Sequence, residues 1–203
     1  MTNLDQNIDK AKEWFLKAAR EGSYEALYKL GQMIKPKEQS KSKCVKIAIN
    51  YYKIEKLVIP NSVTEIEFCA FKDCTSLESI VLPNSVTKIG GRAFMLCARL
   101  QSIVIPNSVT KICRMAFDGC TNLQSIVIPY GVTEIGRFAF YGCTSLQSVV
   151  IPNSVTKIWE GALESCGSLR KITMPKKLKN IPINRITKYY SYTKPYNGTV
   201  KYY

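Results

Sequence analysis

Proline recurs every 23 residues through most of this chain, and that repetition limits the folds open to it more than any other feature. The prolines are Pro60, Pro83, Pro106, Pro129, Pro152 and Pro175, and cysteine and alanine keep the same period. One copy reads L-x-S-I-V-I-P-N-S-V-T-K-I-G-x-x-A-F-x-x-C-T-x. A unit this short cannot bury its apolar side alone, so the copies must stack on one another as a solenoid.

Each copy predicts two short β-rich pieces and a return segment. Ile80 and Leu82 alternate around Val81, which is the period-2 pattern of a strand with one face buried. Proline cannot donate to a strand ladder, so it ends this strand, and Asn-Ser supplies the turn that follows. Val86 begins a second inward-pointing stretch, and Phe94 fills the core from a short helical or irregular segment.

This pattern resembles the BspA-type leucine-rich repeat over roughly residues 54–182. Pro, Val, Ile, Ala-Phe, Cys and Leu recur together at one fixed period. Three substitutions depart from the pattern and leave the fold class unchanged: Leu163 replaces Phe, Trp159 replaces Gly, and Tyr130-Gly131 replaces Asn-Ser. The resemblance implies a repeat solenoid of about five units, mainly β with short helical turns, that serves as an adhesion or interaction module.

The N-terminal segment is expected to cap the solenoid, because a terminal repeat otherwise exposes core residues and strand edges. Helical spacing of Trp14 and Phe15, a break at Gly22 and a capping Ser23 predict two helices within residues 5–34. The string A-K-E-W-F-L-K-A-A-R-E-G-S-Y-E-A-L-Y-K-L-G resembles one SEL-type repeat, a tetratricopeptide relative. We therefore expect a lone helical hairpin at 1–34, packed on the solenoid or serving as a docking module.

The remaining boundaries follow from composition. A polar linker is predicted at 35–43 and the repeat solenoid at 44–182. Tyrosine-rich alternation then runs up to Asn197-Gly198, a strong signal for a hairpin turn. Residues 183–203 are therefore predicted to form a basic, Tyr-rich β-hairpin cap over the last repeat.

Catalysis, metals and cofactors are not expected. The chain contains no histidine, which removes the commonest general base and metal ligand, and no glycine-rich phosphate loop is present. Stacked repeats would place the thiols of successive copies about 5 Å apart, within nominal disulfide reach. Parallel side chains that point into the core favour buried free cysteines instead; the residues are Cys74, Cys97, Cys120, Cys143 and Cys166.

Valine occupies the outward position of the first strand in copy after copy. Two interpretations stand: β-branched residues stack well on a pleated surface, or the valines form a binding floor, since contiguous exposed apolar residues often mark interfaces. The candidate partner-binding residues are Val81, Val104, Val127 and Val150.

Four aromatic residues form a second candidate set, because the repeat does not require them and they are expected to point outward. Tyrosine and tryptophan are favoured interface anchors, and partial burial under a neighbouring repeat or cap is the alternative. The residues are Tyr130, Phe138, Tyr141 and Trp159.

The net charge of +14 is concentrated at the C-terminal end, where residues 170–203 hold nine Lys or Arg and no acidic residue. Basic residues interleaved with tyrosine are typical of nucleic-acid or anionic-lipid contacts. An acidic protein partner and a plain solubilising cap are the alternatives. The candidate polyanion-binding residues are Arg170, Lys171, Lys176, Lys177, Lys179, Arg185 and Lys188.

We therefore expect a non-catalytic protein–protein interaction or scaffold module that uses the solenoid surface. The alternative is nucleic-acid or other polyanion binding through the basic C-terminal end. No apolar leader or membrane-length apolar run is visible, and unpaired cysteines suit a reducing compartment, so the expected location is cytoplasmic, with non-classical secretion as an alternative. The expected state is a monomer or weak homo-oligomer.

Overall fold

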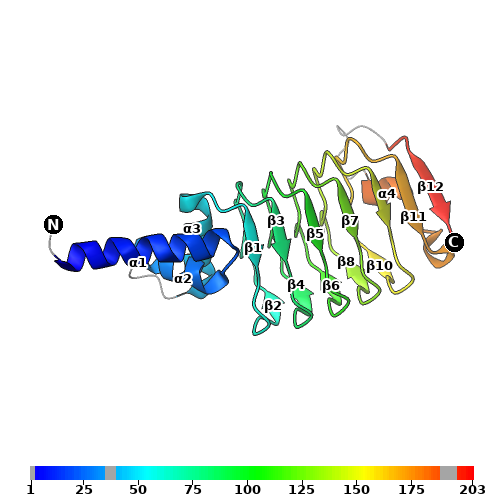
Figure 1. Cartoon of the computed structure of the whole chain (residues 1–203). Helices are drawn as coiled ribbons and strands as arrows, with labels where there is room; N and C mark the ends of the chain where they lie inside the picture. Colours follow the sequence, from blue (N-terminus) through cyan, green and yellow to red (C-terminus); the bar gives the residue numbers. More distant parts are fainter. Residues whose placement is uncertain (1–2, 35–39, 188–195) are drawn as a thin grey trace.

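The computed structural model describes residues 3–34, 40–187 and 196–203. Three helices come first and a row of stacked β turns follows, so that the chain forms an elongated solenoid with its two termini at opposite ends (Figure 1). The helices are α1 (Asn3–Arg20), α2 (Tyr24–Ile34) and α3 (Lys41–Tyr52). The predicted repeat solenoid and the N-terminal helices are thus confirmed.

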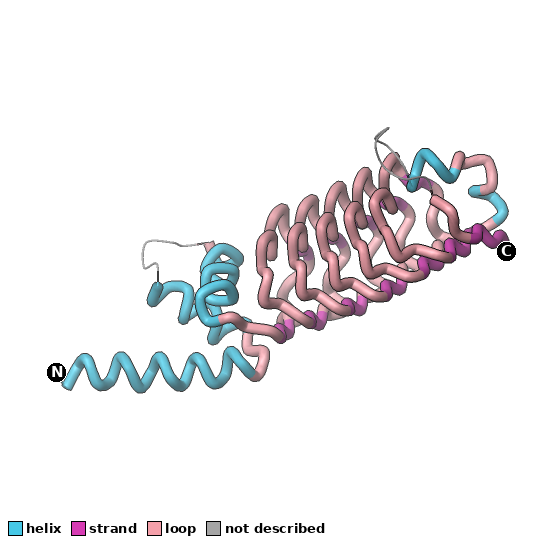
Figure 2. The backbone as a smooth tube through the Cα atoms, turned by 90° about the horizontal axis from the view of Figure 1, so that it is seen from above, coloured by secondary structure: helices cyan, strands magenta, loops and turns pink. Residues whose placement is uncertain are grey.

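The first strand of every repeat joins one seven-stranded parallel sheet, which we call sheet A. These strands lie side by side along one edge of the solenoid (Figure 2). Each of the three-residue strands buries its middle residue and exposes a valine beside it, as the alternation predicts. In sheet order the strands are β1 (Lys56–Val58), β3 (Ser79–Val81), β5 (Ser102–Val104), β7 (Ser125–Val127), β9 (Ser148–Val150), β11 (Lys171–Met174) and β12 (Thr199–Tyr202).

The second strands form a five-stranded parallel sheet, sheet B, on another side of the core. Threonine hydroxyls continue the stacking beside it; for example, Thr110 Oγ1 donates to the Thr87 carbonyl at 3.3 Å, one repeat back. The strands are β2 (Glu65–Ile66), β4 (Lys88–Ile89), β6 (Lys111–Ile112), β8 (Glu134–Ile135) and β10 (Lys157–Ile158).

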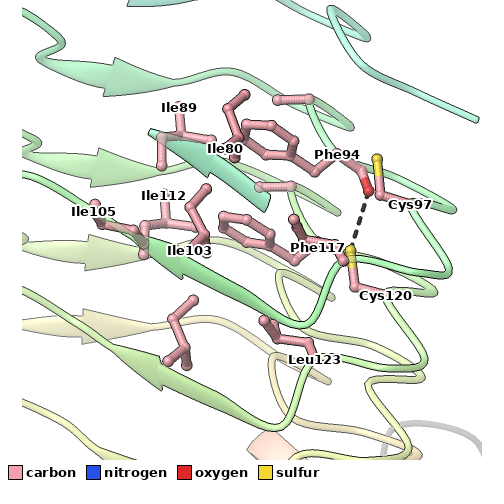
Figure 3. Close-up of a cluster of buried hydrophobic side chains, with 14 of the residues drawn as sticks. Ile80, Ile89, Phe94, Cys97, Ile103, Ile105, Ile112, Phe117, Cys120 and Leu123 are labelled. Carbon is pink, nitrogen blue, oxygen red and sulfur yellow. Dashed lines mark hydrogen bonds between the residues drawn. The ribbon is translucent and has the colours of Figure 1, made fainter. Parts of the chain in front are cut away.

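A continuous column of phenylalanine rings fills the core between the sheets and the return segments (Figure 3). We call Phe71, Phe94, Phe117 and Phe140 the Phe stack. Neighbouring ring centroids lie 5.2 to 5.4 Å apart and the ring planes are nearly parallel. Each repeat therefore supplies one layer of a core that only its neighbours complete.

The five cysteines that recur with the repeat, Cys74, Cys97, Cys120, Cys143 and Cys166, are free, as predicted, and lie beside the Phe stack. Four of the thiols, those of Cys97, Cys120, Cys143 and Cys166, donate to the phenylalanine carbonyl of the preceding repeat. Cys120 Sγ lies 3.2 Å from the Phe94 oxygen (Figure 3). Burial raises the pKa of the Cys74 thiol to about 12 and that of the Cys97 and Cys143 thiols well above its ordinary value. These thiols therefore act as small core residues, not as nucleophiles.

The helices cap the first repeat. Their buried side chains join the solenoid core in one cluster, and Ser23 forms a parallel bridge to Val58 at the edge of sheet A. Helix α3 was not predicted, since residues 41–43 were assigned to a linker and residues 44–52 to the solenoid. The Ser40 hydroxyl caps its first turn by accepting from the Lys43 amide, and Lys53 ends it in a left-handed conformation.

Gly31 sets the spacing between α2 and α3. A Cβ atom built at this position would lie 2.0 Å from the carbonyl oxygen of Cys44, which is backbone and cannot move aside as a side chain could. We expect Gly31→Ala to lower the free energy of unfolding by about 1–3 kcal/mol through overpacking, measured by urea denaturation. Gly167→Ala is the control, because nothing lies within 4 Å of a Cβ atom there; equal effects of the two changes would contradict this account.

The C-terminal end differs from the predicted β-hairpin. A 3-10 turn, Lys176–Leu178, and helix α4, Ile183–Thr187, precede the last strand. β12 then pairs in parallel with β11, with Lys171 opposite Thr199. The predicted arm at residues 188–195 lies outside the described residues. The open edge of β11 thus receives a further parallel strand, which covers the last repeat as a cap should.

Candidate functional site

Sheet A presents an aligned row of valines to solvent, which we call the valine stripe: Val58, Val81, Val104, Val127 and Val150. Each valine lies directly opposite the next in the parallel register. Their exposure rises from 49% at Val58 to 76% at Val104 and Val127. Since neighbouring strands are about 4.8 Å apart, the stripe is roughly 20 Å long.

Polar residues flank the valine stripe on the same face. Two residues before each valine lies a serine, or Lys56 in the case of Val58, and before that a glutamate or glutamine. In the central repeats Ser102, Ser125, Gln101 and Gln124 are all exposed. The stripe ends in Thr173 of β11 and Lys201 of β12. In the central repeats the face is therefore a flat apolar strip bordered by neutral hydrogen-bonding groups, and a lysine lies at each end, Lys56 and Lys201.

The outward face of sheet B has a different character, because its charged side chains are paired across strands. Lys88 contacts Glu65, and Lys111 Nζ lies 2.9 Å from Glu134. The hydrogen bond from Lys111 holds the pKa of Glu134 below its usual value. Trp159 donates its indole N–H to Glu134. Most charged side chains of this face are therefore already paired with one another.

The four aromatic candidates do not form one surface. Tyr130 is 77% exposed at the turn after β7, whereas Trp159 lies beside sheet B with Lys157 Nζ 3.6 Å from its ring centre. The outward placement of Phe138 is wrong, since it is 4% exposed. Its ring packs over Gly161 of the next repeat, where an added Cβ atom would come within 2.2 Å of it. Tyr141 is half-buried against Phe138, at 5.6 Å between ring centroids.

The basic candidates divide in a similar way. Arg170, Lys171, Lys176, Lys177 and Lys179 are all exposed on or beside β11. Arg185 belongs to α4, where it lies 3.3 Å from Glu160, apart from that group. Lys188 is outside the described residues. Lys201 of β12, which was not among the sequence candidates, joins the basic end together with Tyr203, one of the tyrosines predicted there.

No group of three or more His, Cys, Asp or Glu residues is placed to hold a metal ion within residues 3–34, 40–187 and 196–203. Over the same ranges, the structure contains no helix with the length and hydropathy needed to span a bilayer.

Solved structures of leucine-rich repeat proteins share this fold. A leucine-rich repeat protein of T. pallidum is 36% identical with a TM-score of 0.59, over 60% of this chain and 59% of that one. A leucine-rich cell surface protein of Faecalibacterium prausnitzii is 44% identical with a TM-score of 0.57, over 59% of this chain and 31% of that one. A protein from Bacteroides ovatus is 29% identical with a TM-score of 0.55, over 60% of this chain and 42% of that one.

The chain therefore spans less than two thirds of the length of each of these three proteins. A comparison with curated proteins found no match. The family model described as "BspA type Leucine rich repeat region (6 copies)" matches residues 46–133 and 89–188, and neither match reaches α1 or α2. Two overlapping matches that cover more than half of the chain agree with the 23-residue period and the two parallel sheets, and so the chain belongs to the BspA-type leucine-rich repeat family.

Proposed function

We propose that this chain is a non-catalytic protein-binding module whose binding surface is the outer face of sheet A. The valine stripe is the observation that carries the proposal. Five aligned valines stay exposed where the fold would equally accept Ser or Thr, as the neighbouring positions of the same face show. Contiguous exposed apolar residues bordered by polar ones are typical of interfaces.

The face also indicates what the partner must offer. A stable protein interface buries roughly 800 Å² on each partner, which is more than one row of valines supplies. The partner therefore extends over the serine and glutamine rows, whose hydroxyl and amide groups can pair with polar groups at its rim. Sheet B is a weaker candidate, because its charges are already paired with one another.

Helices α1 and α2 complete the proposal. On the sequence resemblance alone, we propose that they form a single SEL-type repeat that serves as the N-terminal cap. Their burial against the first repeat supports a structural role over a free docking module. The cytoplasmic location and the oligomeric state stay predictions.

The test is quantitative affinity capture from extracts of the source cell, with nuclease added, comparing the wild type with a Val104→Ser, Val127→Ser variant. Both valines are exposed, so the change removes apolar contact area without opening the core. We expect recovery of a specific protein partner to fall about tenfold or more, since losing a central contact costs roughly 1–2 kcal/mol each.

Trp159→Gly is the matched control on sheet B, because glycine occupies the same position in two other repeats, at Gly90 and Gly136. It should leave capture unchanged. The proposal fails if the double valine variant retains full capture while Trp159→Gly loses it, which would move the binding surface to sheet B. Capture that resists both changes would also refute it.

A further inference from the structure

Tyrosines and lysines from three distant parts of the chain lie close together at the C-terminal end of the solenoid, beside the turns that follow the strands of sheet A. We call this the Tyr-Lys surface: Tyr130, Lys176, Lys177, Lys201 and Tyr203. The Tyr203 hydroxyl donates to the Ile151 carbonyl at 2.7 Å, so its ring reaches back across the end of β11 toward β9. The Lys176 amide donates to the Tyr203 carbonyl at 2.9 Å, and Lys177 Nζ donates to the Asn153 carbonyl.

Tyr130 lies beside this group. It occupies the position after the repeat proline, where the preceding and following repeats have Asn107 and Asn153. Gly131 lets its turn pack tightly on the preceding one, since a Cβ atom there would lie 2.0 Å from the Asn107 oxygen. The parallel register of β7 and β9 sets Tyr130 beside Asn153, whose carbonyl accepts from Lys177, and the Tyr203 hydroxyl binds two residues before Asn153. Tyr130 is 77% exposed and Tyr203 47% exposed.

No acidic side chain of the described residues forms an ion pair with the lysines of this surface. Glu164 is the last acidic residue of the sequence. Within the described residues Lys176, Lys177 and Lys201 make no ion pair, whereas Glu160 is held by Arg137 and Arg185 at 4.0 and 3.3 Å. The surface therefore combines uncompensated positive charge with aromatic rings, one of which is fixed in place by its own hydroxyl.

We propose that the Tyr-Lys surface binds single-stranded nucleic acid. Bases stack on the rings of Tyr130 and Tyr203, and the phosphates between them contact Lys176, Lys177 and Lys201. A single strand presents flat bases and negatively charged phosphates in alternation. The tyrosine rings of this surface match the bases, and its lysines match the phosphates. An acidic peptide supplies the charge but no flat group, and a duplex keeps its base faces stacked inside. This site adjoins the end of the valine stripe at Lys201 and includes none of the five valines.

The full chain is titrated into a fluorescein-labelled oligothymidylate of about twelve nucleotides, a length in the range that one binding surface of this kind covers, and anisotropy is followed at several salt concentrations. Two variants restore residues of the other repeats and so keep the fold: Tyr130→Asn, and Lys176→Asn with Lys177→Ser. Tyr130→Asn should weaken binding about tenfold by removing one stacking ring. The lysine variant should lower the slope of log affinity against log salt by about 1.4, for two lost phosphate contacts.

The control variant is Lys56→Ser with Arg99→Asn, which also removes two positive charges, but near the opposite end of the solenoid. Both new residues occur at the same positions in other repeats, at Ser79 and Asn122. It should bind within about twofold of the wild type, because exposed charges beyond a Debye length are largely screened.

Three results would overturn the proposal. The first is no binding of the wild type at about 50 mM salt, where electrostatic contacts are strongest. The second is equal affinity for a duplex of the same length with no effect of Tyr130→Asn, which would leave only a basic solubilising end. The third is binding of polyglutamate that is tighter than that of oligothymidylate and equally sensitive to Tyr130→Asn, which would assign an acidic protein partner. None of these readouts depends on the valine stripe, so each can fail independently of the proposed function.

Discussion

Replacing Phe117 by alanine is expected to lower the free energy of unfolding by about 3–5 kcal/mol. The ring is fully buried at the centre of the Phe stack, with Phe94 at 5.2 Å and Phe140 at 5.4 Å between centroids. Alanine loses the transfer free energy of the ring and leaves a cavity that the flanking repeats can close only by shifting against each other. Urea denaturation followed by circular dichroism measures the change.

Phe117→Leu is the matched comparison, because Leu163 occupies the same position in the last full repeat and is itself buried. We expect it to cost no more than about 1.5 kcal/mol. If both variants lose the same stability, the stack is not the source of the effect. Because the repeats contact only their neighbours, Phe117→Ala is also expected to broaden the transition, as the two halves of the solenoid become less coupled.

The solenoid was predictable because the repeat occurs about five times, so the residue preferred at each position can be compared between copies. Pro, Phe and Cys at a fixed 23-residue spacing allow one alternation pattern to be checked in every copy, and the two sheets follow it. The valine stripe was predictable for the same reason, since outward positions of a strand follow directly from inward ones.

Segments that occur once were predicted less well. Helix α3 contains several β-branched residues and depends on tertiary contacts, including the Ser76 hydroxyl, which donates to the Ile54 carbonyl at 2.9 Å just beyond the helix. At the other end, Asn197-Gly198 is a local hairpin signal, but the unpaired edge of β11 offered a parallel partner, and β12 took it.

Contacts between side chains of different repeats could not be predicted from the pattern of a single repeat. Phe138 is buried because the next repeat has Gly161 where other repeats have a side chain, so its exposure is decided 23 residues away. Tyr203 follows β12, and its hydroxyl binds the Ile151 carbonyl 52 residues earlier in the chain, which brings it to the turns beside Tyr130. A sequence pattern cannot show such pairs, because nothing local marks them.

Stability is expected to fall steeply above about pH 9, because the buried thiols cannot ionise in the folded state. An unfolded cysteine has a pKa of about 8.5, whereas burial raises the pKa of Cys74 to about 12. Burial also raises the pKa of Cys97, Cys120 and Cys143. Between these values the unfolded chain binds fewer protons than the folded one, so the free energy of unfolding decreases as pH rises.

This loss of stability is absent below the pKa of a cysteine in the unfolded chain. It then grows with pH until the pKa of the buried thiol in the folded chain is reached. Each thiol contributes about 1.4 kcal/mol per pH unit, so the four together lower stability by up to about 5 kcal/mol per pH unit. Urea denaturation at a series of pH values from about 7 to 11 measures this slope, with a reductant present because thiolates of the unfolded chain form disulfides.

Cys120→Ala separates the thiols from the lysines and tyrosines, which titrate in the same range. At pH 7 the variant loses some stability, since it opens a small cavity and removes the bond to the Phe94 carbonyl. Above pH 9 its stability should fall less steeply than that of the wild type, by about 1.4 kcal/mol per pH unit. The two curves then converge as pH rises. Parallel curves would show that the buried thiols do not set the alkaline limit of this fold, and the loss would belong to the exposed groups instead.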